Sequence, residues 1–109
     1  MLSQPHRLPA SVNLKQSRYR KTPLFAVKFA KNDQKESRFG FVVRKTVDKR
    51  SVYRNRIKRV FRAGIEQHLT DIATGYDMLF FLEKGIIEKS SDEVWQKLHL
   101  LLKEEKLIQ

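Results

Sequence analysis

The chain has 109 residues, an apolar fraction of 40% and a formal net charge of +11. The length fits a single domain, 1–109, and the composition is that of a globular protein. The sequence has no cysteine and no apolar run that could cross a bilayer, which excludes disulfides, Cys-ligated metals and a transmembrane helix. The N-terminal residues lack the apolar segment of a secretory signal, so we expect a cytoplasmic protein.

The positive charge is concentrated in the first part of the chain. Residues 1–62 contain 18 Lys and Arg against 3 Asp and Glu, whereas residues 63–109 contain 5 against 9. Solubility alone would be served by scattered charge, so this distribution predicts a polyanionic partner. A basic surface without a specific partner is the alternative. A membrane surface is disfavoured, because the most basic segment also has an apolar stripe that a core would bury.

The first half of the chain is expected to contain two strands. Residues 1–22 are polar and basic; a short helix is expected at 11–16, and residues 1–20 are expected to be poorly ordered. A strand is indicated where Phe25, Val27 and Phe29 alternate with other residues, and a second over residues 38–45. The polar segment 31–37 between them suggests a hairpin.

The segment TVDKRSVYRNRIKRVFRAGIEQHL, residues 46–69, is expected to be a helix with two different faces. At 100° per residue an apolar stripe forms, with Tyr53 at its edge: Ile57, Val60, Phe61, Gly64 and Ile65. The opposite side is polar and largely cationic: Ser51, Asn55, Lys58, Arg59 and Arg62. Asp48 or Ser51 is expected to cap the helix, and Gly64 to mark its close approach to the sheet.

The last part of the chain is expected to supply a buried strand and a second helix. The apolar run 78–82 predicts a strand that is buried on both faces. Ser90 and Glu93 have the spacing of a capping box at the start of a helix. The apolar stripe of that helix is Val94, Trp95, Leu98, Leu101 and Leu102. Together the elements predict an α+β fold, a small single-layer sheet packed by helices.

Catalytic and metal sites are not indicated by the sequence. His6, His68 and His99 share no ligand spacing, the glycines are isolated, and acids are scarce in the basic part. We therefore expect no catalytic and no metal-binding residues, and a binding protein rather than a self-sufficient nuclease. Strands precede the basic helix where a helix-turn-helix needs another helix, so DNA is disfavoured as the partner and structured RNA is favoured.

Three stretches are similar to the bacterial ribonuclease P protein subunit. YRNRIKRVFR, residues 53–62, resembles the family signature R-N-x-x-K-R-x-x-R. RFGFVVRK resembles the second strand of the family, and GYDMLFF resembles its Gly-Tyr-Asp turn and buried strand. The sequence departs from the family at Asp48, near a position where glycine is usual, and in a shortened first helix. The nearest candidates for the cleft-lining Phe pair of that helix are Leu14 and Tyr19.

The resemblance implies a sandwich like domain 2 of ribosomal protein S5 and a role in tRNA processing. The family subunit binds a catalytic RNA, and the holoenzyme removes the 5′ leader of precursor tRNA by hydrolysing a phosphodiester bond. The RNA subunit and its Mg²⁺ ions carry the catalysis. Carried over by position, the residues implied in RNA binding are Arg54, Asn55, Arg56, Lys58, Arg59 and Arg62, with Arg44 and Lys45 extending the phosphate track. Ala26 and Lys28 are implied in leader binding.

Other interpretations stay open from the sequence alone. The main alternative function is a non-catalytic RNA-binding protein, or a ribosome-associated assembly protein, of the same fold. Residue by residue, Arg56 has the alternative of a solvated or ion-paired side chain. Asn55 has the alternative of bonding the local backbone, and Lys28 that of a solvated strand residue.

Overall fold

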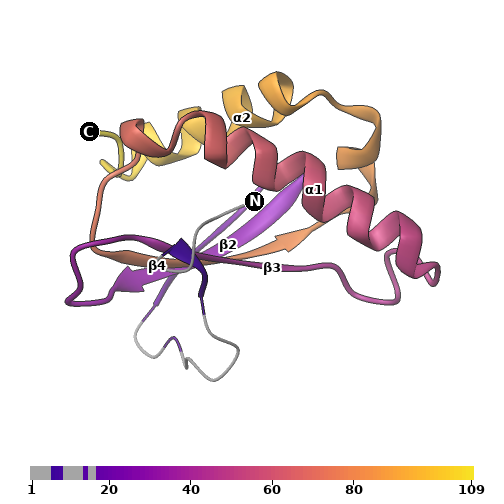
Figure 1. Ribbon diagram of the computed structural model, residues 1–109, viewed down its shortest axis with the longest axis horizontal. Coiled ribbons are helices and arrows are strands. Elements are labelled where there is room, and N and C mark those ends of the chain that lie inside the picture. The colour runs from indigo at the N-terminus through magenta and orange to yellow at the C-terminus, as the bar shows by residue number, and fades with distance from the viewer. Residues whose placement is uncertain (1–5, 9–13, 15–16) are drawn as a thin grey trace.

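The computed structural model describes residues 6–8, 14 and 17–109, which form a four-stranded sheet with two α-helices on one of its faces (Figure 1). The strands and α-helices are β1 (Arg18–Lys21), β2 (Phe25–Lys31), β3 (Arg38–Val42), α1 (Ser51–Gln67), β4 (Tyr76–Leu82) and α2 (Ser91–Glu104). Two short 3₁₀ helices, η2 (Leu69–Asp71) and η3 (Lys84–Glu88), flank β4. The expected α+β fold is confirmed. A helix was also expected at residues 11–16, but of these only Leu14 is among the described residues.

The strand order in the sheet is β1-β2-β4-β3, so β4 lies between β2 and β3. It pairs antiparallel with β2 and parallel with β3. The expected hairpin of the first two predicted strands is therefore wrong. Adjacent strands in sequence pair only about two-thirds of the time. Here β4, the strand with the most continuous apolar run, is inserted between β2 and β3. The polar loop 32–37 therefore crosses over β4 to connect them.

An ion pair at the start of β3 and β4 fixes their register. Arg38 and Asp77 are register partners, and the Nε and Nη2 groups of Arg38 donate to the two carboxylate oxygens of Asp77 at 2.8 and 2.7 Å. Asn32 Nδ2 donates to the same carboxylate at 2.9 Å. The bond to Asp77 raises the pKa of Arg38. Gly75 precedes the pair with φ of +84°, a conformation that glycine adopts without strain.

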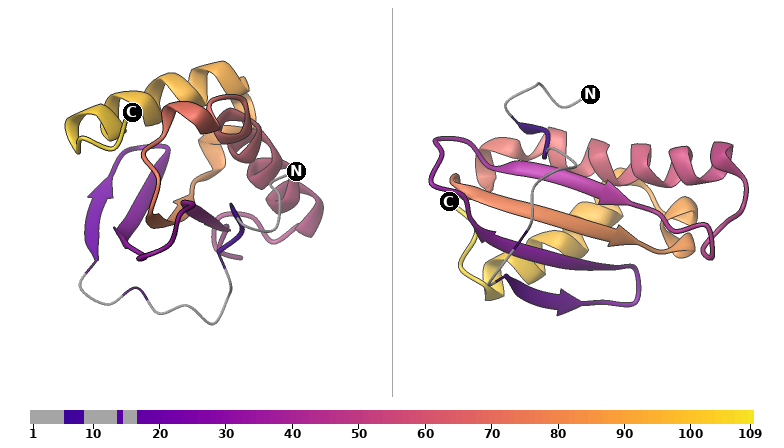
Figure 2. Two further views of the ribbon diagram at one scale, coloured as in Figure 1. Left: turned by 60° about the vertical axis from the view of Figure 1, so that its left-hand side comes forward. Right: turned by 90° about the horizontal axis from the view of Figure 1, so that it is seen from below.

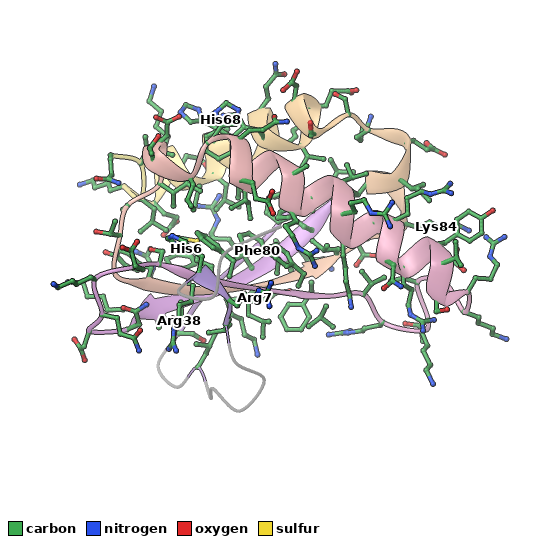
Figure 3. All side chains as sticks on the ribbon, in the orientation of Figure 1. His6, Arg7, Arg38, His68, Phe80 and Lys84 are labelled. Atoms are coloured by element: carbon green, nitrogen blue, oxygen red, sulfur yellow. The ribbon has the colours of Figure 1, made fainter. Side chains whose placement is uncertain are left out.

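The two faces of the sheet differ in burial. Met78, Phe80 and Leu82 of β4 are buried under the helices, whereas Leu79 and Phe81 on the opposite face are half-buried. Figure 3 shows Phe80 between the sheet and α1. The prediction that this strand is buried on both faces is therefore wrong, because both α-helices pack on one face and leave the other open (Figure 2).

Strand β1 was not expected from the sequence, since RYRK has no apolar alternation. It pairs with β2 as an edge strand. Arg20 donates to Glu105 at 2.6 Å and to Glu104 at 2.9 Å, and Arg18 lies 2.8 Å from Glu105. Contacts with the end of α2, far away in the sequence, therefore hold this polar strand against the sheet.

The apolar stripe of α1 packs as expected. Ile57, Phe61, Gly64 and Ile65 are buried, and Val60 packs at the margin of the core. The Phe61 ring lies 4.8 Å from the Phe80 ring and 5.2 Å from the Phe25 ring, measured between centroids. Burying a Phe side chain contributes roughly 1.5–3 kcal/mol relative to exposing it. The core between α1 and the sheet therefore holds the helix in one orientation.

Two expectations for α1 are wrong. The residue at its N-cap is Arg50, and no side chain caps the helix there; Ser51 is the first helical residue. Asp48 instead accepts a hydrogen bond from the Arg50 backbone N–H at 2.9 Å, within the preceding loop. Gly64 approaches α2 rather than the sheet, since a Cβ added there would lie 3.1 Å from the Ser91 backbone oxygen.

Helix α2 agrees with the sequence. Ser90 and Glu93 form both hydrogen bonds of a capping box. The predicted stripe is buried: Val94, Trp95, Leu98, Leu101 and Leu102. Among the described residues, no helix combines the length and the apolar composition that crossing a membrane requires.

Candidate nucleic-acid interface

The outer face of α1 displays its predicted cations beside the edge of the sheet. Asn55 and Arg59 are exposed, and Lys58 and Arg62 are half-buried. Lys58 and Arg62 line a groove of about 360 Å³, which we call the β3 groove; its other lining residues are Arg7, Leu8, Phe39, Gly40 and Phe41. The Arg62 guanidinium carbon lies 5.5 Å from the centroid of the Phe41 ring, so its charge is held over an aromatic face.

The N-terminal segment contributes to the β3 groove from outside the sheet. Arg7 forms a parallel bridge with Phe39, and the Leu8 backbone N–H donates to the Phe39 carbonyl at 3.0 Å. Figure 3 shows Arg7 near β3, on the side below α1. Three cationic side chains from two separate parts of the chain, Arg7, Lys58 and Arg62, therefore surround this groove.

Arg54 and Arg56, near the start of α1, are two further predicted RNA-binding residues, and both contact other parts of this chain. Arg54 donates from Nη1 to the backbone oxygens of Asp48 and Lys49, at 3.0 and 2.9 Å, which ties the loop to the helix. The guanidinium carbons of Arg50 and Arg56 lie 3.7 and 5.4 Å from the Tyr53 ring centroid. Arg56 remains exposed, so its side chain can contact a partner as well as Tyr53.

Asp48 is the acidic residue of this basic loop. Its carboxylate accepts hydrogen bonds from Nε and Nη2 of Arg50, both at 3.1 Å, and from the Arg50 backbone N–H. The side-chain bonds, followed by the backbone bond, lower the pKa of Asp48 to about 2. The same ion pair raises the pKa of Arg50 and partly neutralises its charge. Lys45 and Lys49, by contrast, form no ion pair with the described part of the chain.

The open face of the sheet brings together the two predicted leader-binding residues. Ala26 and Lys28 lie in a hollow of about 150 Å³, which we call the open-face hollow, with Tyr19, Lys21, Arg44 and Phe81 among its lining residues. Lys28 Nζ and the Arg44 guanidinium carbon lie 5.8 and 5.4 Å from the Phe81 ring centroid. Arg44 therefore joins Lys28 rather than the outer face of α1, and Lys45 is exposed in the loop beyond it and lines neither concavity.

Comparison with known proteins identifies the family. A family model described as Ribonuclease P matches residues 10–106. The chain belongs to the ribonuclease P family. It is 36% identical over 84 residues to a ribonuclease P protein component of Fusobacterium nucleatum, covering 73% of this chain and 75% of that protein. It is 39% identical over 66 residues to the same component of Microcystis aeruginosa, covering 61% of this chain and 55% of that protein.

Solved structures of ribonuclease P proteins have the same fold. The Thermotoga maritima protein is 28% identical, with a TM-score of 0.76 over 90% of this chain and 96% of that one. The Staphylococcus aureus protein, at 21% identity, has a TM-score of 0.77 over 95% and 98% of the two chains and supports the fold alone. The chain spans about half the length of the Microcystis and Marinomonas relatives, 55% and 51%. These matches favour the ribonuclease P family over the alternative of a ribosome-associated assembly protein.

Some lining residues of this ribonuclease P family chain were not found from the sequence. Tyr19, a candidate for the cleft, does line the open-face hollow, but from strand β1 and not from a helix. Lys21 was missed because β1 was missed. The apolar run that contains Phe81 predicts burial on both faces, whereas the Phe81 ring is half-buried on the open face. The run 78–82 is apolar throughout, so no alternation in the sequence marks Phe81 as a residue of the open face.

The histidines serve packing rather than a ligand set. The His68 ring stacks on Trp95 with centroids 4.3 Å apart, and His99 lies 5.5 Å from the same ring. Trp95 is buried, as expected. His6 bonds the Ser37 carbonyl through Nδ1 at 2.9 Å. Over residues 6–8, 14 and 17–109, no three His, Cys, Asp or Glu side chains group in a way that could hold a metal ion.

Proposed function

We propose that this chain is the protein subunit of ribonuclease P, a cytoplasmic protein that binds the catalytic RNA and the 5′ leader of precursor tRNA. It assists the endonucleolytic removal of the leader, which gives the mature 5′ end. The observation that carries the proposal is the cationic outer face of α1, held rigid by an aromatic core, in a chain of the ribonuclease P family. The RNA subunit would carry the catalysis. The Mg²⁺ ions would act through that RNA, as the resemblance to the family implies.

The outer face of α1 is suited to the catalytic RNA. Lys58, Arg59 and Arg62 project from a helix that cannot rotate, because Phe61 is locked into the core between them. Cations on a backbone held in this way meet phosphates without first losing backbone freedom. Arg guanidinium groups can also bond phosphate oxygens in pairs. Folded RNA, which presents phosphates at fixed positions, is the partner that gains most from such an array.

The open-face hollow is suited to an unpaired leader. Single-stranded nucleic acid is bound where aromatic rings stack on bases and cations follow the backbone. Tyr19, which is 55% exposed, and Phe81 provide the rings, while Lys28 and Arg44 provide the charges. Both α-helices cover one face of the sheet (Figure 2), and Lys28 and Phe81 alternate with residues that are buried on that face. The hollow that they line therefore opens on the other face, where a bound leader would not compete with RNA on α1.

The first experiment is cleavage of precursor tRNA with and without a bacterial ribonuclease P RNA. Purified protein alone should not cleave, and its addition to the RNA should lower the Mg²⁺ concentration required for cleavage. Cleavage by the RNA-free protein would overturn the assignment of catalysis to the RNA. Failure to bind or assist the RNA would overturn the proposed subunit role.

The second experiment tests the leader path with Lys28→Ala. If Lys28 contacts leader phosphate, its removal should weaken holoenzyme binding to precursor tRNA for all leader sequences and lower the log–log salt slope by roughly 0.7. Mature tRNA, which lacks the leader, should be affected little. Lys31→Ala is the matched control, since Lys31 is exposed on the same strand but outside the hollow. An equal loss for precursor and mature tRNA would remove Lys28 from the leader path.

A further inference from the structure

A second groove lies on the part of the molecule farthest along the sheet from the β3 groove. The groove, which we call the α2 groove, is lined from β1, the β1–β2 turn, the segment after η3, and α2. Its lining residues are Arg20, Thr22, Pro23, Leu24, Lys89, Lys97, Leu100, Leu101 and Glu104. Its volume is about 310 Å³, near the lower end of the usual range of roughly 300–1,000 Å³ for ligand sites. Figure 2 shows α2 over the β1 side of the sheet and α1 over the β3 side.

The floor and rim of the α2 groove differ in chemistry. The floor is aliphatic, and Leu100 is 60% exposed at its edge, although α2 has a fully formed buried stripe on its other side. The rim has Lys89 and Lys97, both exposed, and no ion pair of either is recorded among the described residues. The acidic side chain that lines the groove, Glu104, already accepts a hydrogen bond from Arg20 at 2.9 Å. The rim is therefore cationic in balance.

The α2 groove is less suited to RNA than the β3 groove and the open-face hollow are. The β3 groove and the open-face hollow each place a cation over an aromatic ring, at Phe41 and Phe81. The α2 groove has no aromatic lining residue, so it offers no surface on which a base could stack. A two-fold contact between copies of this chain would bring two lysine rims together, and like charges facing each other at an interface are unfavourable.

We propose that the α2 groove is a docking site for an acidic peptide segment of another protein, with one or two aliphatic side chains inserted between Leu24 and Leu100 and carboxylates beside Lys89 and Lys97. Aliphatic burial anchors the segment, and the charges set its position and exclude basic segments. Because RNA is assigned to α1 and to the open sheet face, a protein partner could occupy the α2 groove while RNA is bound.

Binding of a labelled peptide to the full chain tests this proposal. The probe is a fluorescein-labelled decapeptide of glutamate and leucine, measured by fluorescence anisotropy. We expect saturation below about 1 mM, corresponding to a binding free energy of about −4 kcal/mol or better. The same peptide with lysine in place of glutamate, or alanine in place of leucine, should not saturate. No saturation by the first peptide, or equal binding of the lysine peptide, would overturn the proposal.

Two pairs of variants place the binding in the groove. Lys97→Glu should weaken binding about tenfold, whereas Lys103→Glu, the same charge change on an exposed α2 residue outside the groove, should weaken it at most about twofold. Leu100→Ser should weaken binding, while Val52→Ser, which changes an equally exposed apolar residue on α1, should not. Equal effects within either pair would mean that the peptide binds elsewhere. A Leu100-dependent dimer in sedimentation would identify a second copy as the occupant and overturn the peptide assignment.

Discussion

Helices α1 and α2 pack side by side on one face of the sheet and bury similar apolar stripes, but their N-termini are built differently. Helix α2 begins with a capping box, has Asp92 and Glu93 in its first turn and has Lys103 in its last turn. All of these favour a helix, since acids near the N-terminus and cations near the C-terminus interact well with the macrodipole. Helix α1 has no side-chain cap and no acid in its first turn.

The difference shows how a very basic helix can be stable. Repulsion among the cations of α1 and its uncapped start weaken it locally, so its stability must come from Ile57, Phe61 and Ile65 in the core. The loop contacts of Asp48 and Arg54 hold its first turn from outside. Helix α2 is supported by its own sequence as well as by packing. The face that we propose to bind RNA is therefore on the helix that depends more on the rest of the fold.

The largest effect is expected from removing the anchor of α1. Phe61→Ala should lower the free energy of unfolding by about 3–5 kcal/mol, because the ring is fully buried among Phe25, Phe41 and Phe80. Arg59→Ala, on the exposed side of the same helix, should change it by no more than about 0.5 kcal/mol. Urea denaturation of both variants measures this. If Arg59→Ala proved as damaging as Phe61→Ala, the assignment of the two faces would be wrong.

The outer faces of the two helices should differ in RNA affinity. Arg59→Ala and Arg62→Ala should each weaken binding to ribonuclease P RNA about tenfold, the loss of one charge-assisted contact. The log–log salt slope should fall by roughly 0.7–0.9 for each phosphate contact removed. Lys103→Ala removes an equal charge from α2 and should have little effect. Filter binding at several salt concentrations decides it: an equal loss in Lys103→Ala would mean that only net charge matters.

The sequence was sufficient for features that depend on local periodicity. The α1 stripe, the α2 stripe with its capping box, and the core alternation of Phe25, Val27 and Phe29 all follow from spacings within one element. The outer face of α1 could be predicted for the same reason. The residues that face away from Phe61 on a helix are fixed by the helical repeat, whatever the helix packs against.

Features that depend on distant contacts were missed or wrong. Strand β1 is held in place because Arg20 donates to Glu104 and Glu105, which lie 84 and 85 positions later in the chain. No local sequence pattern indicates such a contact. Gly64 accommodates α2 rather than the sheet, because the two helices share one layer. The open-face hollow gathers Tyr19, Lys28, Arg44 and Phe81 only because β4 lies between β2 and β3. Strand order, and with it half of the candidate interface, was therefore beyond sequence periodicity.

A smaller effect is expected at the helix starts. Ser90→Ala should lower the free energy of unfolding by about 1 kcal/mol, because the Ser90 hydroxyl accepts the Glu93 backbone N–H at 3.1 Å. Ser51→Ala should change it by only a few tenths of a kcal/mol, since Ser51 is exposed in the first turn of α1 and does not cap it. Thermal melts of both variants provide the comparison. Comparable losses would show that Ser51 supports α1 in solution.

A pH-dependent effect is expected at Asp48, which holds the start of α1 from the preceding loop. Its bonds to Arg50 lower its pKa from 3.8 to about 2, so the unfolded chain binds a proton at this site more readily than the folded one. The stabilisation is therefore complete above about pH 4 and is lost as the pH falls towards 2.

Asp48→Asn removes the titrating group while keeping an oxygen that can accept the Arg50 backbone N–H. The native protein should thus be more stable than the variant at neutral pH, and the difference should close between about pH 4 and pH 2. Other carboxyl groups titrate in both proteins and largely cancel in the difference. A stability difference that stays constant down to pH 2 would show that Asp48 does not anchor α1 through its charge.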